Sequence, residues 1–152
     1  MSRAERAKEL FIQGYACSQA VIMAFADLMN ADEEFLLKAS LPFGGGLSRL
    51  RLTCGAVSGM AMVVGLLFSK FEISAENKKQ TYHIVQEVCA RIEGKLGSIN
   101  CAELLNKANL AVEVGGTAEA RTPDYYKKRP CGDIVATVAG VLEEYLDEQG
   151  IL

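Results

Sequence analysis

The sequence predicts an all-α protein, a compact single-domain helical bundle around a buried, glycine-containing central helix. Two observations favour this class. Apolar residues recur at the three- and four-residue spacing of helix faces, whereas no stretch of useful length alternates apolar and polar residues and no Asn-Gly hairpin occurs. The 152 residues fit one domain, 1–152, which is large enough to bury a core without disulfides or a structural metal.

The N-terminal part is predicted to form three short helices, over residues 2–14, 18–29 and 32–41. The first opens on a capping box and ends at a glycine, the second carries apolar residues at helical spacing, and the third starts at an aspartate cap and stops before a proline. Cys17 therefore lies at or just before the first turn of the second helix.

A glycine-rich segment, PFGGGLSRLRL, follows at residues 42–52 and breaks regular structure. Its three glycines give backbone freedom or allow close approach to a ligand, and its arginines bring positive charge towards Cys54. The segment lacks the GK[ST] ending of a phosphate-binding P-loop. The candidate cofactor-binding residues of this segment are Gly44, Gly45, Gly46 and Arg49.

The central helix is expected within residues 52–69, LTCGAVSGMAMVVGLLFS, a run without charge that contains three glycines. A membrane span usually needs about 20 apolar residues, and glycine, threonine, serine and cysteine dilute this run, so we expect burial inside a helical domain and no membrane partner. Thr53 is a plausible N-cap. Cys54 then lies in the first turn, where free backbone N–H groups and the helix dipole favour a thiolate.

Two further helices are predicted in the next part of the chain. Ser74 caps a long amphipathic helix that reaches about Gly94, with Cys89 in mid-helix on the inner face as a small core residue. Asn100 resembles an N-cap with a glutamate three residues on, which places Cys101 in the first turn of another helix.

The C-terminal part combines a loop with a last helix. Residues 107–129 show no sustained period, and a loop of that length inside a domain is usually a functional lid or disordered. Cys131 follows the basic run KKRP and lies at the start of the last helix, which has a clean apolar stripe from Ile134 to Leu146.

Charge and composition exclude several classes of partner. A formal net charge of −3 without a basic stripe gives no reason to expect nucleic acid or an anionic membrane. The first residues lack the apolar core of a secretory signal, so a cytoplasmic protein is expected. In that reducing compartment, the five cysteines are expected as thiols, metal ligands or a redox couple and not as permanent disulfides.

Four of the five cysteines fall at predicted helix N-termini. This shared placement suggests that four helix starts converge on one site that holds a metal ion, an iron–sulfur cluster or a reversible disulfide. For any single cysteine, a small buried residue is the simpler interpretation. The spacing contains no CxxC pair, and without CxxCH covalent c-type haem is excluded. The four cysteines are Cys17, Cys54, Cys101 and Cys131.

The same residues carry a family resemblance. Cys17 in GYACSQAV, the GGG loop, the block CGAVSG that begins at Cys54, Cys101 in NCAELL and Cys131 in PCGDIV resemble the C_GCAxxG_C_C family over nearly the whole chain. The resemblance implies a small protein with a redox or metal role and assigns the four characteristic cysteines to these positions. Cys89 falls outside the pattern.

The leading hypothesis is a redox-active or metal-binding protein with one thiolate-rich site and an unidentified redox partner. With a metal or cluster, Cys17, Cys54, Cys101 and Cys131 are all ligands; without one, they are the catalytic thiols and Cys54 is the expected nucleophile. The alternative is a helical interaction or small-ligand-binding module whose cysteines are incidental. Such a module could form a homodimer. Whether the protein is an enzyme stays open.

Overall fold

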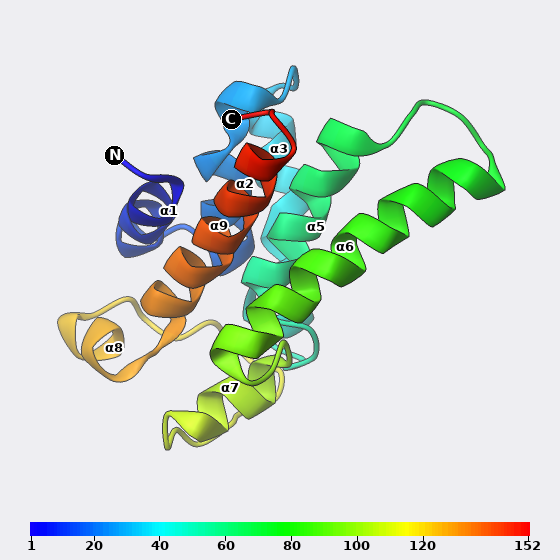
Figure 1. Cartoon of the computed structure of the whole chain (residues 1–152). Helices are drawn as coiled ribbons and strands as arrows, with labels where there is room; N and C mark the ends of the chain where they lie inside the picture. The colour runs from blue at the N-terminus through cyan, green and yellow to red at the C-terminus, as the bar shows by residue number, and fades with distance from the viewer.

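A computed structural model describes all 152 residues and is all-α, as predicted (Figure 1). The one β pairing is an isolated antiparallel bridge between Thr53 and Asn100. No helix combines the length and the apolar character needed to cross a membrane. The helices are α1 (Arg3–Ile12), α2 (Cys17–Ala24), α3 (Glu33–Ser40), α4 (Gly44–Leu47), α5 (Gly55–Phe68), α6 (Ala75–Leu96), α7 (Cys101–Lys107), α8 (Pro123–Lys128) and α9 (Cys131–Glu148).

The core lies where α2, α5 and α9 meet. Helix α5 packs against α2, α6 and α9, and α1 packs against α9 and α2. Figure 1 shows α9 crossing the bundle between α1 and the α5–α6 pair. Large apolar side chains fill the interior, and each contributes about 1.5–3 kcal/mol when fully buried. The largest fully buried ones include Ile22, Phe25, Leu36, Met60, Ile92, Leu142 and Leu146.

Side-chain caps fix most helix starts where the sequence predicts them. A polar side chain at the N-cap accepts a hydrogen bond from a backbone N–H in the first turn and so satisfies a donor that the helix leaves free. The Ser2 start is a full capping box, because Glu5 also accepts from the Ser2 N–H. The other confirmed caps are Asp32, Ser74 and Asn100.

The predicted cap at Thr53 is wrong. Cys54 is the N-cap residue of α5, and the helix begins at Gly55. The reason is tertiary: Thr53 pairs with Asn100, and the Cys54 N–H donates to the Ile99 carbonyl at 2.8 Å. This pairing holds the residues before α5 in an extended conformation. The helix therefore begins at Gly55 and not at Cys54, where it would begin if Thr53 were the N-cap.

Two glycines of α5 allow α2 to approach closely. A Cβ at Gly59 would lie 2.6 Å from the Ser18 carbonyl oxygen, and a Cβ at Gly55 would collide with the Cys17 sulfur and lie 2.7 Å from the Phe43 carbonyl oxygen. Real Cβ atoms cannot approach other atoms this closely. The spacing of four residues between the two glycines therefore serves the α2–α5 crossing and brings Cys17 against the start of α5.

The predicted long loop is only partly a loop. Residues 109–121 have no regular helix, but α8 then forms over six residues, with the Thr122 hydroxyl accepting from the Tyr125 N–H at 3.2 Å. A six-residue helix is too short to show a 3.6-residue period, which is why the sequence pattern misses it. Helix α6 extends past Gly94 to Leu96 and ends at Gly97, which has φ +84°.

Candidate functional site

The four helix starts that carry cysteine surround one cavity of ≈340 Å³. The fifth cysteine, Cys89, lies in mid-helix on α6 and does not line it. The structure therefore places the four cysteines that the sequence analysis singled out around the same cavity. The charged and sulfur-bearing side chains around the cavity are Cys17, Cys54, Cys101, Cys131, Arg49, Arg51, Arg121, Arg129 and Glu119.

Each cavity cysteine is placed by the first residues of its helix. Cys17, Cys101 and Cys131 are the first residues of α2, α7 and α9, and Cys54 is the N-cap of α5. By accessible surface Cys54 is buried, with 6 % exposed, while the other three are half-buried. The cavity thus collects thiols from four segments that are distant in sequence.

The glycine segment lies between the start of α2 and the start of α7. The Gly45 backbone hydrogen-bonds the Cys17 sulfur, and a Cβ at Gly46 would lie 2.6 Å from the Cys101 Cβ. Both glycines have positive φ, +67° and +68°, a conformation that other residues rarely adopt. Gly44 and Gly45 line the cavity, and Gly46 lies against Cys101. These glycines therefore allow Cys17 and Cys101 to pack against the same short segment of backbone.

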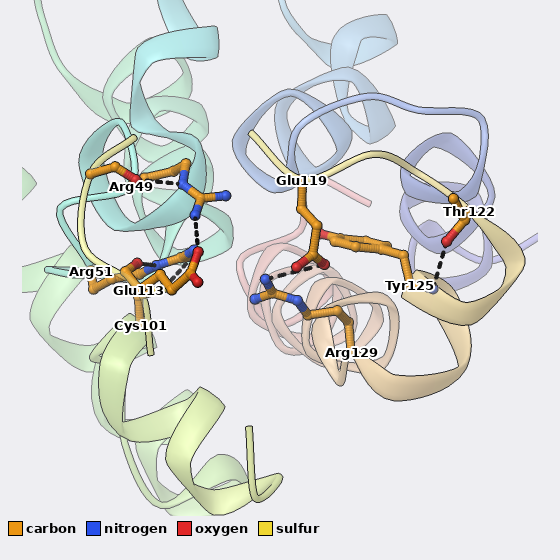
Figure 2. A network of polar contacts seen from close by, with 9 residues as sticks. Arg49, Arg51, Cys101, Glu113, Glu119, Thr122, Tyr125 and Arg129 are labelled. Atoms are coloured by element: carbon orange, nitrogen blue, oxygen red, sulfur yellow. Dashed lines mark hydrogen bonds and ion pairs between the residues drawn. The ribbon is translucent and has the colours of Figure 1, made fainter. Parts of the chain in front are cut away.

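Two arginines form the wall beside Cys101, as Figure 2 shows. Arg51 donates from Nε to the Glu113 carbonyl at 2.9 Å and from Nη1 to the Cys101 sulfur at 3.7 Å. Arg49, a predicted site residue, donates from Nε to the Gly115 carbonyl at 2.9 Å and pairs with the Glu113 carboxylate at 3.5 Å. Both arginines thus hold residues 113–115 against the glycine segment.

Two more arginines line the opposite wall. Arg129 pairs with Glu119 at 3.5 Å and lies over the Tyr125 ring at 5.2 Å (Figure 2). Arg121 donates to the carbonyls of Phe11 and Tyr15 at 3.0 and 3.2 Å and stacks on the Phe11 ring. Sequence reasoning missed both as site residues. Arg129 stands two positions before Cys131, which is a usable signal, whereas nothing near Arg121 in the sequence points to the site.

The thiol pKa values differ from the sequence expectation. Burial raises the pKa of Cys131 to about 12 and also raises the pKa of Cys17 and Cys54. The expected lowering at helix N-termini is therefore wrong for these three thiols. For Cys17, loss of hydration outweighs the backbone hydrogen bonds from Gly45 and Ser18.

The cavity cysteines also influence one another's pKa values through their charges. After burial, its negative charge is the strongest like-charge influence on the pKa of both Cys54 and Cys131. Cys101 in turn acts on the pKa of Cys17. The geometry places the Cys17 sulfur against the start of α5, because a Cβ at Gly55 would collide with it.

The donor set does not fit a metal centre in this arrangement. No three side chains among the Cys, His, Asp and Glu residues come together in a group that could hold a metal ion. A structural zinc or iron–sulfur site is usually held by four ligands at short distance. The metal or iron–sulfur centre thus stays a prediction, without a grouped set of ligands in this structure.

Comparison with known proteins gives one family match. The family model described as "Putative redox-active protein (C_GCAxxG_C_C)" matches residues 15–145, a range that includes all four cavity cysteines. No curated protein and no solved structure matches the chain.

Proposed function

The chain belongs to the C_GCAxxG_C_C family of putative redox-active proteins, and we propose that it is a thiol–disulfide redox protein whose cavity cysteines cycle between dithiol and disulfide. One observation carries the proposal: four cysteines from separate helix starts line a single cavity. The role suits a reducing compartment such as the cytoplasm, where exposed protein thiols stay reduced between turnovers.

We assign the first attack to Cys101. The Cys101 residue is half-buried, and its sulfur accepts a hydrogen bond from the Arg51 guanidinium. The sequence favours Cys54 as the nucleophile, but Cys54 is almost fully buried and burial raises its pKa. Cys17 is the resolving thiol, because the glycine segment contacts both Cys17 and Cys101.

The proposed half-reaction reduces a disulfide by two electrons. The Cys101 thiolate attacks one sulfur of the substrate, the substrate S–S bond breaks, and the leaving thiolate takes up a proton. The Cys17 thiol then gives up its proton and attacks the Cys101 sulfur of the mixed disulfide. A Cys17–Cys101 disulfide forms, and the second substrate thiol leaves with a proton. The protein dithiol is oxidised and the substrate disulfide becomes two thiols.

A redox titration tests this function. The reduced chain is equilibrated in thiol–disulfide buffers of increasing oxidising strength, free thiols are counted, and crosslinked peptides are mapped by mass spectrometry. We expect two thiols to disappear together and the crosslinked peptide to contain Cys17. Cys17→Ser should abolish the crosslink, whereas Cys89→Ser, outside the cavity, should leave it intact.

Two outcomes contradict the proposal. Stoichiometric zinc, or iron with sulfide, in protein purified without oxygen would assign the cysteines to a metal centre. Slowly reacting thiols with no disulfide at any potential would favour the alternative, a helical ligand-binding module with incidental cysteines.

A further inference from the structure

We propose that the cavity binds a small disulfide that carries carboxylate groups, and that the four arginines select it. The assignment rests on the proposed dithiol function and adds the substrate class to it. Two properties of the cavity carry the inference: its size and the charge of its walls.

The size indicates a small molecule. A volume of ≈340 Å³ lies at the lower end of the range for ligand sites, about 300–1,000 Å³. Part of the wall is apolar, with Phe11, Leu104, Ile134 and the Tyr125 ring among the lining residues. Such a wall accepts the carbon and sulfur atoms of a short disulfide.

The charge of the walls is positive. Arg51 and Arg121 have no carboxylate partner, and the other two arginines have only loose ones at 3.5 Å. Those partners, Glu113 and Glu119, have side chains that are 85 % and 54 % exposed, whereas the side chains of Arg49 and Arg129 are only 14 % and 10 % exposed. Ion pairs with exposed carboxylates are weak. The cavity therefore keeps an excess of positive charge that an anionic ligand would neutralise.

The guanidinium groups are also held in place. Arg49 and Arg51 are anchored through Nε by the carbonyls of Gly115 and Glu113, so their terminal nitrogens have donors to spare. A planar guanidinium binds a carboxylate through two parallel hydrogen bonds. Because Arg51 also contacts the Cys101 sulfur, a carboxylate bound on this wall holds the rest of the molecule beside the attacking thiol.

Three disulfides of similar size and different charge test the substrate class. They are 3,3′-dithiodipropionate with two carboxylates, neutral bis(2-hydroxyethyl) disulfide, and cystamine with two ammonium groups. The rate of mixed-disulfide formation is measured by mass spectrometry, and each rate is divided by the rate for the urea-unfolded chain to remove intrinsic reactivity. We expect the normalised rate to be about tenfold higher or more for the dicarboxylate than for the neutral disulfide. Cystamine should be slowest, and salt should reduce the difference.

Matched arginine variants locate the effect. Arg129→Gln should lower the ratio of the dicarboxylate rate to the neutral rate. Arg49→Gln, on the opposite wall, should lower the same ratio. Arg6→Gln removes the same charge from an exposed site on α1, where the side chain is 47 % exposed, and should leave the ratio unchanged.

The outcomes separate this inference from the proposed function. Equal normalised rates for the three disulfides, together with a Cys17 disulfide in the redox titration, would overturn the substrate class and leave the dithiol function standing. No reaction with any disulfide and no crosslink would overturn both.

Discussion

A thiol at the start of a helix experiences two opposing effects. Backbone N–H groups and the helix dipole favour the thiolate, whereas burial removes water and favours the thiol. Burial is the larger effect for Cys17, Cys54 and Cys131. A helix start therefore does not by itself activate a cysteine. The distinguishing feature of Cys101 is a guanidinium at its sulfur.

Site-resolved alkylation tests the raised pKa of Cys131. Its pKa is about 12 because of burial, so the thiolate fraction, and with it the rate of alkylation by iodoacetamide, should rise about tenfold per pH unit through pH 10. The same cysteine in the urea-unfolded chain should level off near its usual pKa, about 8.5. A plateau at or below pH 9 in the folded chain would contradict the assignment.

Local chemistry explains which elements could be predicted from sequence. Caps such as Ser2 and Asn100 involve residues only three positions apart, so their spacing is visible in the chain. The start of α5 could not be predicted, because Cys54 is held by a hydrogen bond to Ile99, a residue 45 positions away. Helix α8 escaped because it is too short to show a period.

Two glycines of α5 provide a matched test of the α2–α5 crossing. A Cβ at Gly59 would lie 2.6 Å from the Ser18 carbonyl oxygen, whereas a Cβ at Gly65 would meet nothing within 4 Å. Gly65→Ala should raise the free energy of unfolding by about 0.5–1 kcal/mol through helix propensity alone. Gly59→Ala should lower it by about 1–3 kcal/mol, the usual cost of overpacking. Urea denaturation measures both changes.

The crossing also positions the site, which gives the same pair a second readout. Because Ser18 follows Cys17, forcing α2 away from α5 should slow formation of the Cys17 disulfide in Gly59→Ala but not in Gly65→Ala. A Gly59→Ala chain as stable as the wild type would show that the two helices do not depend on this contact.

At the scale of the whole molecule, the sequence could suggest the convergence of the cysteines but not the walls around them. Shared placement at helix starts, and resemblance to a family that is confirmed over residues 15–145, both pointed to one group. The arginine walls arise from contacts across the chain. Arg49 reaches Gly115, 66 residues away, and Arg121 reaches Phe11 at a separation of 110. No local pattern encodes such pairs.

Buried thiols also link the stability of the whole fold to pH. Where burial raises a thiol pKa, the folded chain keeps a proton that the unfolded chain releases above about pH 8.5, so the free energy of unfolding falls as pH rises. The stabilisation is complete below that pH and is lost above it, by up to about 1.4 kcal/mol per pH unit for each thiol. Cys54, which is 6 % exposed, should contribute nearly the full slope.

Comparison with a variant isolates the contribution of Cys54, since tyrosines and lysines also titrate in this range. Urea denaturation of the reduced chain and of Cys54→Ala at intervals from pH 8 to 10.5 gives two curves of unfolding free energy against pH. Above pH 9, the free energy of unfolding of the variant is expected to fall less steeply with pH than that of the wild type. The difference in slope should correspond to nearly one proton, whatever the stability of the variant at pH 8. Parallel curves would mean that the Cys54 thiol titrates alike in both states. In that case water would reach the Cys54 thiol, and Cys54 would again be a candidate for the first attack.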